Sequence, residues 1–526
     1  MAELIGKSIV GFQRLGSSPT TVQGLNPANG EALLPAYHGV SAAEVNEAAR
    51  LASVSFASYS RTSGKQRAAF LRKIAANIEA LGETLTTRAT QETGLPIGRI
   101  QSETGRTCNQ LRLFADLVEE GSWVDARIDR ADPNRQPLAK PDVRSMLRPL
   151  GPVVVFGASN FPLAFSVAGG DTASALAGGN PVIVKAHHAH PGTSELVGMA
   201  ISDAVHECDL AEGVFSLLYG SGSDVGVALV KHPLIKAGGF TGSRSGGRAL
   251  FDAASSRPEP IPFYAEMSSV NPVVLLRGAL SERGDQIATG LHASVILGAG
   301  QFCTNPGLVF LEDDQQAAAF IERLSVLMSG TAQQTMLTPG ISSSYRRGIS
   351  SRADQPGVKT VASSAEQVSG CQVGTVLFRT DAVTYLANPE LSEEVFGPST
   401  LLVTCSDRRE MLEVLRTLEG QLTATIHGNE DDLKTSSELV NILETKAGRL
   451  VFNGFPTGVE VCHSMVHGGP YPATSDGRST SVGTRAIFRF TRQVCYQSFP
   501  DYALPDELKD ENPLGIWRLV DGTLMQ

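Results

Sequence analysis

Cys303 stands in a sequence context that could present a reactive thiol. Gly298 and Gly300 precede it, and the pair Asn305-Pro306 follows it. Such a turn can place a cysteine and its backbone N–H at the start of a helix, where the helix dipole favours the nucleophilic thiolate. The alternative interpretation is that of an unreactive core thiol, which is the usual state of a single cysteine in an apolar stretch.

Glu266 and Asn160 are the other two candidates for catalysis. Glu266 is a single carboxylate in the apolar segment Phe263-Tyr-Ala-Glu266-Met, and partial desolvation is expected to raise its pKa toward the range of a general base. The alternative is a glutamate that is paired or solvated. Asn160 lies at the end of a predicted strand and before Pro162, where its side chain could complete a turn or act as an amide donor.

A glycine-rich turn and a lysine indicate where a ligand could bind. Gly220, Gly222 and Gly226 follow a predicted strand and open a predicted helix, one residue off the usual dinucleotide-binding spacing. The spacing alone leaves cofactor binding and a plain tight turn both open. Lys185 ends a buried strand, so its ammonium group must reach the ligand edge of the sheet or be paired.

These candidates are positioned by alternating strands and helices. Short apolar runs predict strands at 152–156, 181–184, 214–218 and 237–241, with a helix over about 193–206 between two of them. This pattern predicts an α/β fold with a doubly wound parallel sheet, whose ligands bind at the carboxyl ends of the strands. A second α/β region is predicted from 266 to about 450. Residues 41–120 are predicted to be helical, beginning with a capping box of Ser41 and Glu44.

Composition excludes several other classes of protein. The chain has 526 residues, 42% of them hydrophobic, and a formal net charge of −10. The acidic balance argues against a nucleic-acid or anionic-membrane surface. Seven scattered cysteines without a CxxC pair argue against a disulfide framework and a structural metal site. No signal peptide or membrane-spanning run is apparent, so we expect a cytoplasmic protein.

Taken in order, these motifs resemble the NAD(P)-dependent aldehyde dehydrogenase family along nearly the whole chain. The resemblance begins at Asn26-Pro-Ala-Asn-Gly-Glu31 and continues through GPVVVFGASNFPLA, NPVIVK, FTGS, AEMSSVNPV, GQFCTNPG and EEVFGP. It implies a Rossmann-like cofactor domain, an α/β catalytic domain and a β oligomerisation arm.

The resemblance also implies a role for each catalytic candidate. Cys303 would attack the aldehyde carbon to form a thiohemiacetal, while the Asn160 amide and the Cys303 N–H form an oxyanion hole. Glu266 would then activate the water that hydrolyses the thioester. A CoA-acylating relative would generally lack the glutamate, and a catalytically silent binding or structural relative could lose any of the three. All three are present.

The resemblance also implies which residues bind the cofactor. Lys185 and Glu394 are similar to the residues that hold the two riboses, and Phe396 to a residue flanking the nicotinamide ribose. Gly242 and Ser243 match the turn beside the pyrophosphate, and Gly222 belongs to the glycine turn. At position 188, where strictly NAD-using members typically carry glutamate, this chain has His188. An imidazole can donate to a 2′-phosphate that a glutamate would repel, so we expect NADP to be accepted and preferred, with NAD possible.

The segment from 452 to 474 narrows the expected substrate. It resembles a branch that includes bacterial α-ketoglutaric semialdehyde (2,5-dioxopentanoate) dehydrogenases and an NADP-dependent fatty aldehyde dehydrogenase of luminous bacteria. A semialdehyde needs a cation or amide donors for its carboxylate, whereas a fatty aldehyde needs an apolar tunnel. We favour the semialdehyde. The pocket residues expected for either substrate are Phe156, Phe161, Phe165, Phe455 and His467.

The resemblance divides the chain into three modules. Residues 1–125 and 150–265 would bind the dinucleotide, residues 266–479 would form the catalytic domain, and residues 126–149 and 480–526 would form the arm with a C-terminal extension. An arm of this kind normally adds to a neighbouring subunit's sheet, so we expect a homodimer in preference to a homotetramer. Trp517 is expected to pack the extension onto the body of the protein.

Overall fold

The apolar runs in the first half of the chain form a buried seven-stranded sheet. The computed structural model describes residues 3–364 and 370–526, and the strand order of this sheet is β11-β10-β7-β8-β9-β1-β2. Strands β7 to β11 are mutually parallel, and β1 and β2 extend the sheet in antiparallel fashion. Their bounds are β1 Ser8–Val10, β2 Gln13–Leu15, β7 Val153–Phe156, β8 Val182–Lys185, β9 Phe215–Leu218, β10 Ala237–Thr241 and β11 Phe263–Glu266.

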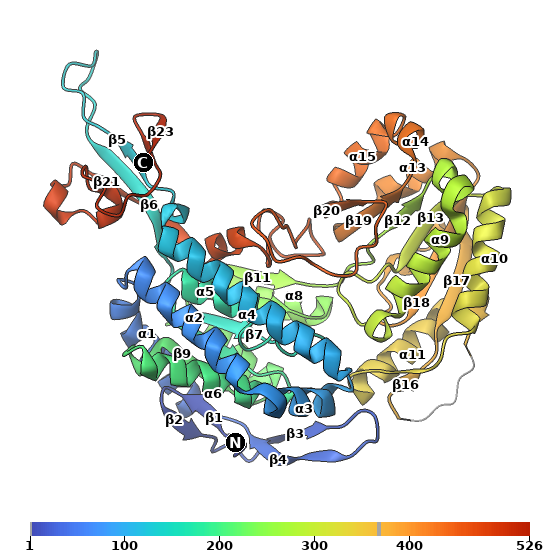
Figure 1. Cartoon of the computed structure of the whole chain (residues 1–526), viewed down its shortest axis with the longest axis horizontal. Helices are drawn as coiled ribbons and strands as arrows, with labels where there is room; N and C mark the ends of the chain where they lie inside the picture. The colour runs from blue at the N-terminus through green and yellow to red at the C-terminus, as the bar shows by residue number, and fades with distance from the viewer. Residues whose placement is uncertain (1–2, 365–369) are drawn as a thin grey trace.

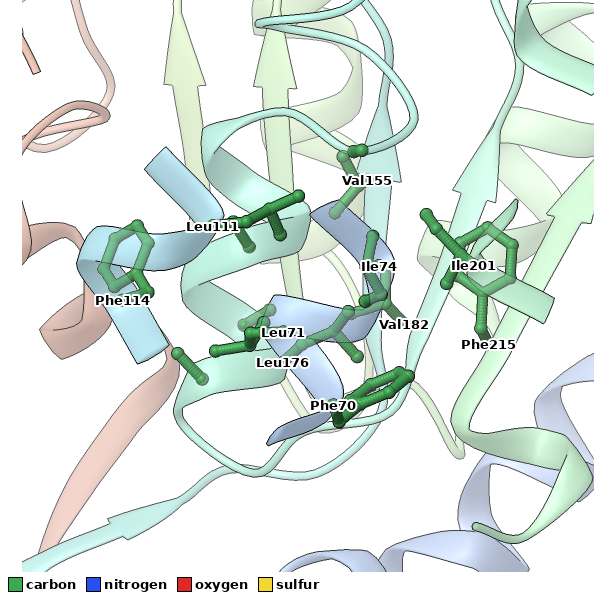
Figure 2. Close-up of a cluster of buried hydrophobic side chains, with 14 of the residues drawn as sticks. Phe70, Leu71, Ile74, Leu111, Phe114, Val155, Leu176, Val182, Ile201 and Phe215 are labelled. Carbon is green, nitrogen blue, oxygen red and sulfur yellow. The ribbon is translucent and has the colours of Figure 1, made fainter. Parts of the chain in front are cut away.

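Helices cover both faces of this sheet, as the continuous apolar strands require. Val153 and Val155 face one core, while Val154 and Phe156 face the other, because successive strand side chains point in opposite directions. The first core is filled by helices α2, α4, α5 and α6, as Figure 2 shows. The second is filled by α1, α7 and α8. The bounds of the helices are α1 Ala42–Tyr59, α2 Gly64–Ala80, α3 Gly82–Thr93, α4 Ile97–Glu120, α5 Gly170–Ala177, α6 Pro191–Glu207, α7 Val227–Lys231 and α8 Arg244–Ser255.

The local predictions agree with these elements, with shifts of one or two residues at several boundaries: β7 begins at Val153, β8 runs over Val182–Lys185 and α6 over Pro191–Glu207. Both halves of the Ser41–Glu44 capping box are formed at the start of α1, and β10 has the predicted bounds. Strand β9 begins one residue later than predicted, because Glu212–Val214 forms a 3₁₀ turn that leads into it.

The second half of the chain forms another seven-stranded sheet, in the order β15-β17-β18-β13-β12-β19-β20. The two sheets lie in separate lobes of the molecule (Figure 1). The strands are β12 Val273–Leu275, β13 Leu308–Glu312, β15 Lys359–Ser363, β17 Val376–Asp381, β18 Ser399–Cys405, β19 Gln421–His427 and β20 Ala447–Phe452. The helices are α9 Arg277–Ile296, α10 Gln315–Ser329, α11 Pro339–Ala353, α12 Ala382–Ala387, α13 Arg408–Thr417, α14 Glu430–Lys434 and α15 Ser437–Glu444. Two short ladders join β3 Thr21–Leu25 with β4 Ala32–His38 and β14 Gln334–Thr335 with β16 Gln372–Val373.

A five-stranded sheet projects from the first lobe (Figure 1) and contains the C-terminal extension. Its order is β21-β6-β5-β22-β23, with β5 Arg127–Asp129, β6 Val143–Pro149, β21 Thr491–Gln497, β22 Arg518–Val520 and β23 Thr523–Met525. The extension is fixed by the buried side chains of Leu508 and Ile516. The prediction for Trp517 is wrong, because its side chain is 47% exposed.

Across the described residues, every helix is too short or too polar to cross a bilayer.

Candidate active site

The two sheets and the segment after β20 bring the predicted catalytic residues together. Glu266 is the last residue of β11, and its Oε1 lies 2.9 Å from Nε2 of His467. The same Nε2 lies 3.4 Å from the Sγ of Cys303. The hydroxyl of Ser481 donates to Oε2 of Glu266 at 2.6 Å. Thiol, imidazole and carboxylate therefore form one connected group.

The backbone before Cys303 forms an unusually tight turn. Gly298, Ala299 and Gly300 all have positive φ angles, between 57° and 67°. A Cβ at Gly300 would collide with the backbone of Gly397. The side-chain amide of Asn271 holds the far side of the turn by donating to the carbonyl oxygens of Cys303 at 2.8 Å and Asn305 at 2.9 Å. The position of the thiol is thus fixed by backbone contacts.

The expected thiolate-favouring helix start is absent at Cys303. The residue lies in a turn between a 3₁₀ segment and β13, and no helix of the described residues begins there. Burial, reinforced by the charge and hydrogen bond of Glu266 and by the charge of Glu394, raises the pKa of the Cys303 thiol well above its ordinary value. The thiol is therefore protonated at neutral pH and needs a base.

The expected rise in the pKa of Glu266 is also wrong. Burial by itself raises it, but the field of the His467 ring and hydrogen bonds from His467, Ser481 and Cys303 outweigh burial. The pKa of Glu266 is therefore lower than that of an ordinary glutamate. The carboxylate is ionised at neutral pH and available to accept a proton.

Asn160 lies on the opposite side of the cysteine turn. It follows β7 closely, and its Nδ2 donates to the carbonyl oxygen of Gln301 at 3.0 Å. Gln301 precedes Cys303 by two residues, so this contact places the Asn160 amide beside the cysteine turn. An amide donor beside the nucleophile is what an oxyanion hole requires.

The predicted pocket residues divide into two groups. Phe161 and Phe165 lie near the thiol, since Phe161 packs on Phe302 at 5.2 Å and Phe165 on His467 at 5.9 Å between ring centroids. His467 is part of the catalytic group itself. The other two aromatic residues lie in separate hydrophobic cores: Phe156 against Phe240 and Phe263, and Phe455 against His427.

Lys185 and His188 follow one another at the carboxyl end of β8. Lys185 is only 7% exposed, its ammonium group has no hydrogen bond or ion pair within residues 3–364 and 370–526, and burial lowers its pKa to about 8. His188 is exposed and its ring stacks on His187 at 4.4 Å. Partial burial and the charges of Lys185 and His190 lower the pKa of His188. A buried amine without a partner beside an exposed imidazole suits a polyhydroxylated or anionic ligand.

The remaining predicted cofactor residues lie at turns beyond the strand ends. Ser243 caps α8, and the Gly242 N–H donates to the carbonyl oxygen of Glu266. Gly222 begins the single π-helical turn between β9 and α7. Glu394 and Phe396 line a small hollow next to Gly300 and Asn305, with burial raising the pKa of Glu394 to about 7.

Sequence reasoning missed two residues that hold the site. Asn271 precedes a proline and has a φ of 46°. The Asn-Pro dipeptide is a known turn signal, so the sequence did contain an indication of this residue. Ser481 has no comparable signal, because its importance depends on a contact across the fold with Glu266.

The same donor atoms could in principle hold a metal ion. Those of Glu266, Cys303 and His467 all lie within 4.8 Å of one another. However, Nδ1 of His467 has no partner among the described residues, whereas metal-bound histidines usually have their second nitrogen oriented by one. The arrangement suits proton transfer between a thiol and a carboxylate better than metal binding.

Comparisons with known proteins agree on one family. The model of the aldehyde dehydrogenase family matches residues 15–490. "Alpha-ketoglutaric semialdehyde dehydrogenase 2" of Azospirillum brasilense is 52% identical over 521 residues, covering 99% of each chain. "Alpha-ketoglutaric semialdehyde dehydrogenase" of Acinetobacter baylyi is 48% identical over 527 residues, covering 100% of each.

Solved structures show the same fold at much lower identity. A betaine aldehyde dehydrogenase of Staphylococcus aureus in complex with NAD+ superposes with a TM-score of 0.79 at 18% identity, covering 95% of this chain and 98% of the other. A 1-pyrroline-5-carboxylate dehydrogenase superposes with a TM-score of 0.77 at 20% identity, covering 93% and 92%.

Proposed function

The chain belongs to the aldehyde dehydrogenase family, and from this premise we propose that it oxidises α-ketoglutaric semialdehyde to 2-oxoglutarate. The activity rests on the connected group of Cys303, His467 and Glu266. The choice of substrate is supported by two relatives that bear this activity in their names and match the whole chain at 52% and 48% identity.

In the first step, Sγ of Cys303 bonds to the aldehyde carbon. The thiol proton passes to the carboxylate of Glu266, which is ionised and hydrogen-bonded to that thiol. The aldehyde oxygen gains negative charge and accepts hydrogen bonds from the Asn160 amide and the Cys303 N–H. The adduct is a thiohemiacetal on Cys303.

In the second step, the thiohemiacetal becomes a thioester and is hydrolysed. The nicotinamide, when bound, supplies the acceptor for the hydride that leaves the former aldehyde carbon. Glu266, having released its first proton, takes another from the water that attacks the thioester. Cys303 then leaves with the proton that Glu266 took from the water, which restores the thiol and the carboxylate, and the acid product dissociates. His467 and Ser481 hold the carboxylate in place through both steps.

A nicotinamide dinucleotide fits the residues at the carboxyl ends of the first sheet, because Lys185 is a buried amine without a partner in the described chain. Lys185 and Glu394 would hold the riboses, with Phe396 beside the nicotinamide ribose and Gly222, Gly242 and Ser243 near the pyrophosphate. His188 would donate to a 2′-phosphate, which favours NADP over NAD.

The alternative substrate is a medium- or long-chain aldehyde. It is favoured by the aromatic cluster of Phe161, Phe165 and Phe302 close to Cys303, since apolar walls suit an alkyl chain.

We further infer that residues 126–149 and 480–526 form an arm that joins two copies of the chain. Among the described residues, β21 and β23 are the edge strands of the arm sheet, each paired on one side only. Such edges commonly pair with another chain.

The deciding experiment measures kcat/KM for α-ketoglutaric semialdehyde, glutarate semialdehyde, hexanal and a long-chain aldehyde, each with NAD and NADP. We expect α-ketoglutaric semialdehyde to exceed hexanal by more than about 100-fold, or ~2.7 kcal/mol of transition-state stabilisation. Higher values for hexanal or longer chains would replace the proposed substrate by the alternative. Cys303→Ala should remove all aldehyde-dependent reduction of the dinucleotide.

The same measurement tests the cofactor. His188→Glu should weaken NADP much more than NAD, because the carboxylate repels the 2′-phosphate and can bond the 2′-hydroxyl of NAD. Equal losses with both cofactors would contradict the role of His188.

A further inference from the structure

A buried arginine beside the catalytic group has no role in the steps described above. Arg106 lies on α4, and its guanidinium carbon is 5.2 Å from the centre of the Phe165 ring. Phe165 in turn packs against His467, which contacts Cys303. Arg106 thus stands one aromatic ring away from the catalytic group. Its charge is close enough to lower the pKa of the Cys303 thiol.

Arg106 is only weakly held by the protein. Its Nε and Nη2 donate to one carbonyl oxygen, that of Val459, at 3.4 and 3.3 Å. Its Nη1 is buried and has no hydrogen-bond partner, and Arg106 forms no ion pair within the described residues. A buried guanidinium carries five donors and loses its hydration, so leaving it without an anion is costly. Burial accordingly lowers the pKa of Arg106.

The neighbouring arginines are already engaged. Arg99, two turns earlier on α4, forms an ion pair with Glu103 at 2.8 Å. Arg449, on β20, donates to the carbonyl oxygens of Gly458 at 3.0 Å and Pro456 at 2.5 Å. Glu103 itself also accepts from the N–H groups of Leu163 and Ala164. Arg449 also has a buried Nε without a partner, and Arg99 lies over the Phe161 ring. Of the three arginines, Arg106 is the one with an unpartnered terminal nitrogen, Nη1, and it lies next to the Phe165 ring.

We propose that Arg106 binds the carboxylate of the substrate, at the end remote from the aldehyde. An aldehyde carbon bonded to Cys303 would extend along Phe165 and present its carboxylate to Nη1 and Nη2 of Arg106. The two oxygens of a carboxylate match the fork of a guanidinium, which gives direction as well as charge. This inference rests on the proposed oxidation of an aldehyde that carries a carboxylate.

The test compares paired substrates in Arg106→Met and Arg106→Lys. Arg106→Met should lower kcat/KM for α-ketoglutaric and glutarate semialdehydes by about 100-fold or more, while hexanal changes less than about fivefold. Arg106→Lys should recover part of the loss, because lysine supplies the charge without the fork. The matched control Arg99→Met, whose charge is neutralised by Glu103, should leave the ratio of the two substrate classes unchanged.

A second readout is independent of substrate. Arg106→Met should raise the pKa of the Cys303 thiol, seen as slower alkylation by iodoacetamide at a fixed pH, which also shows that the variant is folded.

The outcomes separate the two proposals. Equal losses for hexanal and the semialdehydes in Arg106→Met, or a selective loss in Arg449→Met instead, would overturn the role of Arg106 while leaving the reaction intact. A wild-type enzyme that prefers glutarate semialdehyde and depends on Arg106 would support the role and replace the proposed substrate. A wild-type enzyme that does not discriminate in favour of carboxylated aldehydes would overturn both.

Discussion

The protonation states of Cys303 and Glu266 depend on two opposing effects, burial and the neighbouring charged and hydrogen-bonding groups. Glu266 is buried and Cys303 is half-buried, yet burial is decisive only for the thiol. The carboxylate receives hydrogen bonds from His467 and Ser481, whereas the thiol faces the negative charge of Glu266. The free enzyme therefore holds a thiol next to a carboxylate.

Replacing Glu266 by glutamine should make the thiol more acidic. The substitution removes the charge and the hydrogen-bond acceptor that raise the pKa of Cys303, and each unit by which the pKa falls gives roughly tenfold more thiolate at a fixed lower pH. We expect faster alkylation by iodoacetamide at pH 7.5 in Glu266→Gln, with a lower midpoint in the pH–rate profile. Aldehyde oxidation should nevertheless be lost.

Cys208 provides the internal control for that experiment. It lies at the end of α6, so its alkylation in a Cys303→Ala background should not respond to Glu266→Gln. An unchanged or higher midpoint for Cys303 in Glu266→Gln would contradict the assigned electrostatics.

At the scale of elements, the turn before Cys303 depends on backbone packing between two segments. Gly300 adopts a φ of 67° and lies directly against Gly397. Behind the turn, the amide of Asn271 donates to the Cys303 and Asn305 carbonyls, while the Oε1 of Gln421 accepts from the N–H groups of Val270 and Asn271. The nucleophile is therefore positioned by the second sheet, through strands β12 and β19.

Gly300→Ala should lower both stability and activity. An alanine would adopt a left-handed conformation and collide with Gly397, which should cost about 2 kcal/mol or more. We expect a lower Tm and a kcat reduced by at least about tenfold, since the displaced thiol no longer meets the aldehyde correctly. Gly98→Ala, at an exposed position in α4 with open space around it, should leave both Tm and kcat unchanged or raise Tm slightly. Comparable losses in the two variants would argue against a specific role for the turn.

At the scale of the whole molecule, the active site draws on both lobes. The first sheet supplies Glu266, the turn after β7 supplies Asn160, and the second lobe supplies Cys303. His467 and Ser481 come from the segment that returns from β20 to the arm. A second feature at this scale is β20, an edge strand of the second sheet in the part of the chain that the structure describes, where Leu450 and Phe452 are 38% and 46% exposed. We propose that this edge receives β21 of the partner's arm.

The combined variant Leu450→Lys and Phe452→Lys should weaken the proposed dimer. Two lysines on the receiving strand would place buried charge at the interface. Analytical ultracentrifugation should give twice the mass of one chain for the wild type and a shift toward the single-chain mass for the variant. Val326→Lys, at a 61% exposed position on α10, should have no effect. A wild type that sediments as a single chain would contradict the proposal.

The sequence by itself determined the fold class and the chemical types at the site. A continuous apolar strand such as Val153–Phe156 can bury both of its faces only between two layers of helices. Periodicity and composition were therefore sufficient for the α/β prediction. The family motifs likewise selected Cys303, Glu266 and Asn160 as the catalytic candidates without coordinates. They did so because a nucleophile, a base and an oxyanion donor must each be a particular residue type.

Only the tertiary structure decided the properties that depend on surroundings. The pKa shifts of Cys303 and Glu266 were predicted in the wrong direction, because both depend on neighbours in space. The pKa of Cys303 responds to burial and to the charges of Glu266 and Glu394. That of Glu266 responds to His467 and Ser481, which lie 201 and 215 residues away in the chain. The unpartnered edge of Arg106 is invisible in the sequence for the same reason. Electrostatics and burial are sums over neighbours in space, and a sequence lists neighbours along the chain.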